Sequence, residues 1–349
     1  MGIVLKKFIF ILFVSFIVLS VEEAKSQISI TGGKGLCRVL EADPITPADI
    51  FLNTNITSFM EQEGQSVALA KYYRFNINLT VGLANYLECY LNFVPYQDNQ
   101  RNLWGQIGDT QLGLKYLTPL SSKVFKFGLA GHFKFPSAKY PNVPFEVFST
   151  DKPAWAIKAL LSLDFLPIMP NFPMKFNLNF GYLDHDIYDQ YFSSKIDQLI
   201  IGTGLKYSIR SIQFYTEYSG EIFFNNPAHV AFNQNSMRIT QGIRFLGPWN
   251  NTIHIAFDFA FTQYDSLENL DIFHKKYSDW RAMIGISHRF SVYKYFDKTA
   301  KLEKERRLRE LRKLEAIRKK RQNVKQDLKK MQNELKKGKK KGNHGKTSG

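Results

Sequence analysis

The chain has 349 residues, 44 % of them hydrophobic, with 47 Lys and Arg against 31 Asp and Glu for a formal net charge of +16. Two cysteines are too few for a disulfide scaffold. Residues 298–349 hold 21 Lys and Arg against 6 Asp and Glu, so this one segment carries about 15 of the excess positive charges and the rest of the chain is near neutral.

Residues 1–26 predict a secretory signal peptide. Lys6 and Lys7 precede an apolar run over residues 8–19, and Ala24 and Ser26 supply small side chains for a signal peptidase. The alternative is a transmembrane anchor, but about 14 apolar residues fall short of the roughly 20 that a helix needs to cross a bilayer. Gln27 is therefore the predicted first mature residue.

Residues 27–50 follow without a clear strand pattern. They are expected to form either a periplasmic segment or a plug that folds inside the domain that comes after them. Cys37 lies too far beyond the apolar run to be a lipoprotein cysteine. An unpaired cysteine is expected both here and at Cys89, with a disulfide between the two as the alternative in an oxidising compartment.

Strict alternation of apolar and polar residues begins at residue 71 and recurs to residue 290. Phe75, Ile77 and Leu79 alternate with Asn76 and Asn78, a period of two that puts one set of side chains on each face of a strand. Segments of about 11–15 residues exceed the mean soluble strand of about 5–6, and about 9–11 residues suffice to cross a bilayer. Twelve strands are predicted, over residues 51–60, 71–83, 86–95, 106–117, 123–135, 154–165, 174–184, 197–207, 212–222, 236–246, 252–264 and 280–291.

The connections between these strands alternate between short and long. The short set is 84–85, 118–122, 166–173, 209–211 and 247–251, and the long set is 97–105, 136–153, 185–196, 223–235 and 265–279. Outer-membrane barrels have short periplasmic turns and long extracellular loops. The predicted fold class is therefore an all-β, antiparallel, up-and-down transmembrane barrel over residues 51–292 in the bacterial outer membrane. The alternative, a soluble β-sandwich, requires shorter strands.

The two faces of the predicted strands differ in character. Outward positions are mostly Phe, Leu, Ile and Val, with aromatic residues near strand ends at Tyr73, Tyr116, Trp155, Tyr182, Tyr207, Tyr218 and Trp280. Inward positions hold more bases than acids. The candidate lumen-lining residues are Arg74, Lys115, Lys126, Lys134, Lys158, Lys175, Lys206, Arg238, Arg244, Arg281, Arg289, Glu88, Asp109, Asp164, Glu217, Glu221 and Asp258. A modest preference for anions is expected if the pore is open.

Three short stretches resemble one bacterial group: Gly35–Val39, residues 75–86 with the turn sequence VGLANYLE, and residues 108–116. The group is the outer-membrane barrels of the porin-like and phenol-degradation (meta-pathway) type. The resemblance implies a barrel with a channel or transport role and carries over no catalytic residue. The last strand, with Gly285, His288 and Phe290, is similar to the terminal signal of barrel assembly, although a tail follows it here.

No motif for enzymatic or metal chemistry is found in the sequence. The seven histidines show no His-Glu-x-x-His spacing, and no Cys-x-x-Cys, phosphate loop or nucleophile elbow occurs. His229 and His274 lie in predicted loops near Asn233 and Asp271, where solvated histidines are common. The protein is therefore expected to have no catalytic, metal or cofactor site and not to be an enzyme.

The C-terminal tail is predicted to be a basic periplasmic helix over residues 293–337, followed by a disordered Lys/Gly-rich end at 338–349. Residues 298–337 contain no Gly or Pro, and Glu303 with Arg307 and Glu315 with Lys319 have the favourable i,i+4 order. About 40 helical residues make a rod of about 60 Å.

The sequence therefore predicts a porin-like channel or transporter for small solutes, surrounded by outer-membrane lipid. The alternative is a structural anchor whose basic tail binds cell-wall polymer, anionic lipid or an acidic periplasmic protein. No nucleic-acid partner is expected in an exported protein.

Overall fold

In the computed structural model the described residues are 27–62, 69–98, 105–138, 152–169, 171–185, 197–209, 211–224, 232–262, 278–292 and 320. The contacts divide the chain into two units, residues 1–292 and 293–349. The predicted signal peptide, the tail helix and the disordered end all lie outside the described residues, Lys320 excepted. Within the described part of the chain, no helix has both the length and the apolar character needed to cross a membrane.

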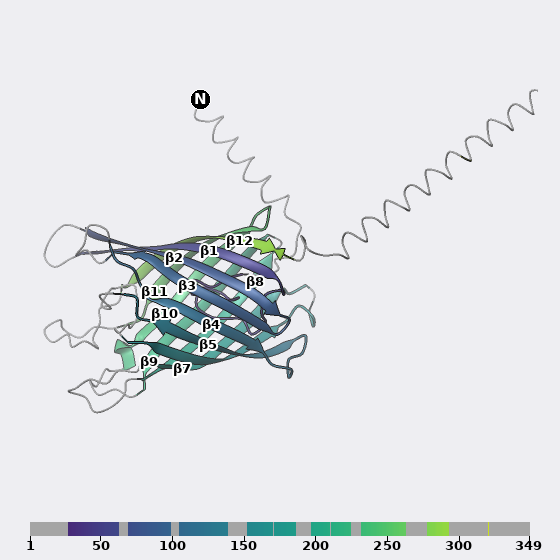
Figure 1. Ribbon diagram of the computed structural model, residues 1–349, viewed down its shortest axis with the longest axis horizontal. Coiled ribbons are helices and arrows are strands. Elements are labelled where there is room, and N and C mark those ends of the chain that lie inside the picture. The colour runs from purple at the N-terminus through teal and green to yellow at the C-terminus, as the bar shows by residue number, and fades with distance from the viewer. Residues whose placement is uncertain are drawn as a thin grey trace, which may run out of the picture. The chain divides into compact units, whose positions relative to one another are not determined.

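Twelve antiparallel strands close into a barrel in which each strand pairs with its neighbours in sequence and β1 pairs with β12 (Figure 1). Closure runs from the pair Asp49↔Ser291 to the pair Ser58↔Ala282. This confirms the predicted fold class for the barrel. The strands are β1 (Asp49–Gln62), β2 (Leu69–Ala84), β3 (Leu87–Gln97), β4 (Thr110–Leu117), β5 (Phe125–Phe135), β6 (Ala154–Asp164), β7 (Met174–Asp184), β8 (Asp197–Ile209), β9 (Ile212–Phe223), β10 (Ser236–Leu246), β11 (Asn251–Ala260) and β12 (Trp280–Ser291), with a 3-10 turn, η1, at Phe232–Gln234.

Strands β7, β10 and β12 have the predicted bounds, whereas β11 ends at Ala260 rather than at 264 and β4 begins late. It begins at Thr110 rather than at 106 because the chain before it is bent. Gly105 has a φ of +63°, and Gly108 donates its N–H to the carbonyl of Val94. Among residues 105–109, which the structure describes, only Gln106 forms a bridge, with Gln97.

The outer face of the barrel is apolar, and the inner face is polar. On β7 the outward Leu178 and Phe180 are exposed, whereas the inward Asn177 and Asn179 are buried. Pairs of aromatic rings lie near strand ends, as at Trp155 and Tyr182, whose ring centroids are 5.8 Å apart. In a closed sheet of this kind every backbone group in the ladder is paired, so the exterior can face lipid.

Residues 27–48, called the inner segment, precede β1 and contact inward-facing side chains from all around the barrel. The segment folds into two tight turns, with bridges between Ile28 and Lys34 and between Gly35 and Leu40. Gly32 and Gly33, with φ of +89° and +81°, occupy the left-handed region that glycine adopts without strain. A small apolar core forms where Leu36, Cys37 and Val39 of the segment pack on Tyr215, Ala256 and Met283 of the barrel wall.

Candidate functional site: the lumen

The inner segment is held by polar contacts as well as by apolar ones. The Glu217 carboxylate on β9 accepts hydrogen bonds from the backbone N–H groups of Cys37 (2.9 Å), Arg38 (2.8 Å) and Val39 (3.2 Å). On β7, Asn179 accepts the N–H of Leu40 at 2.7 Å and donates to its carbonyl at 2.9 Å. The barrel wall thus satisfies backbone groups of the segment that have no regular secondary structure to pair with.

Arg38 extends from the inner segment to β11. Its guanidinium forms a bidentate pair with Asp258, at 2.6 and 3.1 Å, and reaches the Thr240 hydroxyl at 3.2 Å. Arg238 lies 3.5 Å from the same carboxylate. A bidentate arginine pair fixes orientation as well as distance, so this contact sets the position of the segment in the lumen.

Two acids of the inner segment meet four lysines, and we call this group the ion cluster. Glu41 pairs with Lys175 at 2.6 Å and with Lys206. Asp43 pairs with Lys34, with Lys175 and, at 3.5 Å, with Lys126. Burial opposes ionisation of both acids, but the nearby ammonium groups outweigh it and lower the pKa of Glu41 and the pKa of Asp43 below their usual values.

The ion cluster lies at the short-turn end of the barrel, since Lys126, Lys175 and Lys206 are within a few residues of strand ends on that side. Other wall residues that hold the inner segment also lie near the short-turn end of the barrel. Glu88 accepts the N–H groups of Lys34 and Ile45 and pairs with Lys115 at 3.0 Å. Arg244 donates to the carbonyl groups of Gly35 (2.9 Å) and Leu36 (2.8 Å).

All twelve strands contribute a contact to the inner segment. The remaining ones come from Asn53 on β1, Thr80 on β2, Lys115 on β4, Ser162 on β6 and, through its sulfur, Met283 on β12. The segment therefore fills the cross-section of the lumen on the short-turn side.

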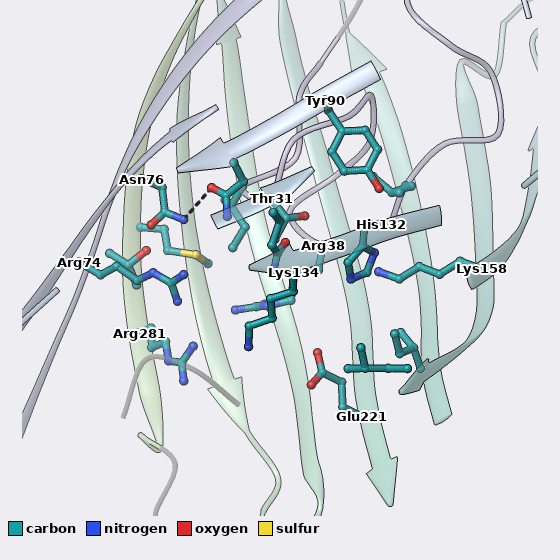
Figure 2. Close-up of a pocket in the computed structure, with 18 residues that line it drawn as sticks. Thr31, Arg38, Arg74, Asn76, Tyr90, His132, Lys134, Lys158, Glu221 and Arg281 are labelled. Carbon is teal, nitrogen blue, oxygen red and sulfur yellow. Dashed lines mark hydrogen bonds between the residues drawn. The ribbon is translucent and has the colours of Figure 1, made fainter. Parts of the chain in front are cut away.

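A cavity of about 150 Å³ remains on the long-loop side of the inner segment. Its inner boundary includes Thr31 and Arg38 of the segment. Its wall is made by inward residues near the long-loop ends of the strands: Thr57, Arg74, Asn76, Asn92, Gln111, His132, Lys134, Lys158, Leu183, Ile200, Glu221 and Arg281 (Figure 2). The lining holds five lysines and arginines against one carboxylate, so the cavity is basic.

The structure distributes the candidate lumen residues over four groups. Arg74, Lys134, Lys158, Arg281 and Glu221 line the cavity, with Lys134 paired to Asp109 at 3.0 Å. Lys126, Lys175 and Lys206 belong to the ion cluster, and Glu88, Lys115, Glu217, Arg238, Arg244 and Asp258 surround the rest of the inner segment.

The last two candidates lie away from these groups, at the short-turn rim. There Arg289 pairs with Asp49 at 2.7 Å, and Asp164 accepts the N–H of Leu166 at 3.1 Å.

The residues of the inner segment itself were not among the predicted site residues. Arg38, Glu41 and Asp43 lie in a stretch with no periodicity, and their partners Asp258 and Lys175 are more than 130 residues away in the chain. The available signal was the two acids of this short stretch, Glu41 and Asp43, which match the excess of inward lysines.

Neither a metal site nor a disulfide is formed by the residues that the structure describes. Cys37 and Cys89 are both free, and Cys37 is fully buried. Burial, followed by the nearby Glu217 carboxylate, raises the pKa of the Cys37 thiol well above its usual value. A buried thiol of this kind behaves as a small apolar side chain.

No family model and no curated protein matches the chain. The NanC porin has a similar fold, with 13 % identity, 68 % of this chain and 98 % of that chain covered, and a TM-score of 0.48. The KdgM porin has 7 % identity, 69 % and 99 % covered, and a TM-score of 0.43. An outer membrane channel from Pseudomonas putida F1 has 10 % identity, 71 % and 98 % covered, and a TM-score of 0.47. At such identities function has to be argued from the residues of this lumen, and membership of the phenol-degradation group stays a prediction.

Proposed function

We propose that the protein is an outer-membrane channel for small solutes, described here in a state closed by its inner segment. The observation that carries the proposal is the nature of the closure: a polar, charged lumen is blocked by one short segment rather than filled by side chains of its own wall. A barrel that served only as an anchor would need no such segment.

The exterior supports the placement in a membrane. Large hydrophobic side chains such as Leu114, Ile157, Phe180 and Ile284 are more than half exposed on the outward face. Surfaces of this kind are stable in lipid and would aggregate in water. The long, polar connections on one side and the short turns on the other favour the outer membrane, with the short turns in the periplasm.

The contacts of the inner segment are compatible with its leaving the lumen. A hydrogen bond that is exchanged for water contributes only about 0.5–1.5 kcal/mol net. The polar groups at Glu217, Asn179 and Arg244 that the segment would leave behind can all be hydrated. Leaving the lumen would also expose Ile28, Leu36, Val39, Leu40 and Ile45, which pack on the wall in three small apolar clusters, so the closed state is the more stable one.

Conductance in planar bilayers tests the proposal. We expect the full-length protein to show discrete openings, and a Glu41→Gln/Asp43→Asn variant to open more often because it lacks the ion pairs of the cluster. Silent bilayers for both proteins, each shown to be folded, would contradict a channel function.

The C-terminal tail carries a second proposal, which its charge of about +15 favours. We propose that it binds an anionic periplasmic partner, either cell-wall polymer or anionic phospholipid. The full-length protein should co-sediment with sacculi or anionic liposomes at low salt and be released as salt rises. A chain truncated after Val292 should not bind. Equal sedimentation of the full-length and truncated proteins would contradict binding by the tail, which would then serve only as a spacer.

A further inference from the structure

We propose that the channel carries short acidic peptides and that residues 40–43 of the inner segment close it as an internal copy of such a solute. These residues occupy the binding site, which lies on the wall formed by β5, β6, β7 and β8 at the short-turn side of the lumen. The inference rests on the proposed channel function, since the segment must be able to leave the lumen. It adds the class of solute and the competition that opens the channel.

Three lysines of this wall hold the two carboxylates of the inner segment. Lys175 on β7 binds Glu41 at 2.6 Å and Asp43 at 2.5 Å, so both carboxylates meet at one ammonium group. Lys206 on β8 binds the other oxygen of Glu41, and Lys126 on β5 lies 3.5 Å from Asp43. A ligand with carboxylates on alternate residues therefore meets a row of ammonium groups spaced to receive both of them.

The positive charge of this wall remains when the inner segment leaves. In the described part of the chain, the three wall lysines form ion pairs only with Glu41 and Asp43. The acid beside them in the sheet is Asp164, opposite Lys175, and counting it leaves three lysines against one carboxylate. The short turns at this side, 118–122, 166–173 and 209–211, contain no Asp or Glu. The vacated wall is therefore cationic, and an anionic ligand relieves the repulsion between its lysines.

The wall also contacts the peptide backbone beside and between the two acids. Asn179 accepts the N–H of Leu40 at 2.7 Å and donates to its carbonyl at 2.9 Å. Ser162 accepts the N–H of Ala42 at 2.9 Å and donates its own hydroxyl to Asn177 at 2.6 Å. These contacts use the N–H and C=O groups that every peptide carries and that a simple dicarboxylate lacks.

Asn177 is an independent sign that the wall can bind a ligand other than the inner segment. Its side chain is fully buried, and its Nδ2 has no hydrogen-bond partner among the described residues. Since buried polar groups are nearly always satisfied, this N–H group is a donor that the seated segment leaves unused. It is available to an oxygen atom of a bound solute.

The middle position of the site fits a small side chain. Ala42 belongs to one apolar cluster with Ala130 and Leu160 of the wall, and Leu40 belongs to the same cluster. Gly128 on β5 lets the backbone of the segment approach, because a Cβ added there would lie 3.0 Å from the carbonyl oxygen of Ala42. The wall therefore selects an acidic, a small and a second acidic residue in succession, preceded by an apolar one.

Titration calorimetry with the full-length Glu41→Gln/Asp43→Asn protein in detergent tests the inference, because the segment of this variant leaves the wall lysines to a ligand. The probe is the peptide acetyl-Leu-Glu-Ala-Asp-amide. We expect it to bind at least about tenfold more tightly than each of three matched ligands. These are acetyl-Leu-Gln-Ala-Asn-amide, which lacks the charges, acetyl-Leu-Glu-Trp-Asp-amide, which is too large in the middle, and glutarate, which lacks a peptide backbone.

Two further variants and a labelling measurement locate the bound peptide. Lys175→Gln in the same background should reduce the affinity of the acidic peptide to that of its uncharged form. Lys123→Gln, which removes a charge from an exposed turn at the same side, should leave the affinity unchanged. In a Cys89→Ser protein with an intact inner segment, the acidic peptide should speed thiol labelling of Cys37, because peptide and segment cannot occupy the wall together.

The inference is overturned if the acidic peptide does not bind, if any of the three matched ligands binds as tightly, or if Lys123→Gln weakens binding as much as Lys175→Gln does. An unchanged rate of Cys37 labelling would overturn it too, since the peptide would then bind elsewhere. Calorimetry does not need conduction, so specific peptide binding by a protein that never conducts would contradict the channel function alone. Conduction without peptide binding would contradict the peptide site alone.

Discussion

We expect Glu217 to hold the inner segment in the lumen more strongly than any other single residue. Its one carboxylate accepts hydrogen bonds from the backbone N–H groups of three consecutive residues of the segment. In Glu217→Gln one oxygen becomes an NH₂ donor facing other donors. We expect the segment to leave the lumen more often, so that Cys37 reacts roughly ten- to hundredfold faster with a thiol reagent. The measurement is the labelling rate in a Cys89→Ser background.

The matched control for this variant is Glu221→Gln. It removes a carboxylate from the same strand that makes no hydrogen bond to the inner segment among the described residues. Its labelling rate should equal that of the parent protein. Equal rates in all three proteins would show that Glu217 does not hold the segment.

The ion cluster makes the closure sensitive to acid. Because the lysines lower the pKa values of Glu41 and Asp43, the ion pairs stabilise the closed state above the usual carboxyl pKa of about 4 and are lost as pH falls through the lowered values. We therefore expect constant Cys37 labelling by a pyridyl disulfide from about pH 7 to 5 and faster labelling below about pH 4. Glu41→Gln/Asp43→Asn should label fast throughout. If labelling of that variant still became faster below about pH 4, the effect of acid would come from titratable groups other than Glu41 and Asp43.

At the scale of elements, the end of the inner segment fits against β2 only because Gly82 has no side chain. The Gly82 carbonyl accepts the N–H of Ala48 at 2.8 Å, and a Cβ added at Gly82 would lie 2.3 Å from the carbonyl oxygen of Thr46. Gly82→Ala should therefore unseat the segment and speed Cys37 labelling while the barrel still folds, as judged by its heat-modifiable gel mobility.

Gly131→Ala on β5 is the control, because a Cβ there meets its nearest atom, the Ala156 carbonyl oxygen, at an ordinary 3.7 Å. It should label at the rate of the parent protein. Slow labelling of Gly82→Ala would mean that the segment tolerates a side chain at this contact.

The strands could be predicted from the sequence because apolar and polar residues alternate within each strand on its own. Alternation along residues 174–184 needs no knowledge of the rest of the chain, and β7 has those bounds. The inner segment offers no such pattern. Its conformation depends on contacts such as that of Cys37 with Glu217, 180 residues apart, and on turns at Gly32 and Gly33 that a single sequence does not specify.

For the whole molecule, the alternation of short and long connections predicts the orientation in the membrane. An epitope tag at Val143, in a long connection, should be labelled on intact cells, whereas a tag at Asn85, in a short turn, should be labelled only after the envelope is opened. Equal labelling of the two tags on intact cells would contradict the orientation and the periplasmic placement of the tail.

Closure of a solute channel by the inner segment can be tested with a reversible covalent link between the segment and the barrel wall. The Cys37 Sγ and the Met283 Sδ are 3.7 Å apart, so the two side chains are in contact, and Met283→Cys in a Cys89→Ser background is a pair to be joined by a disulfide that ties the segment to β12. We predict that oxidation abolishes conductance and that a reducing agent restores it in the same bilayer. A Cys37→Ser/Met283→Cys protein should conduct in both conditions. Undiminished conductance through the oxidised, disulfide-linked protein would contradict closure by the inner segment.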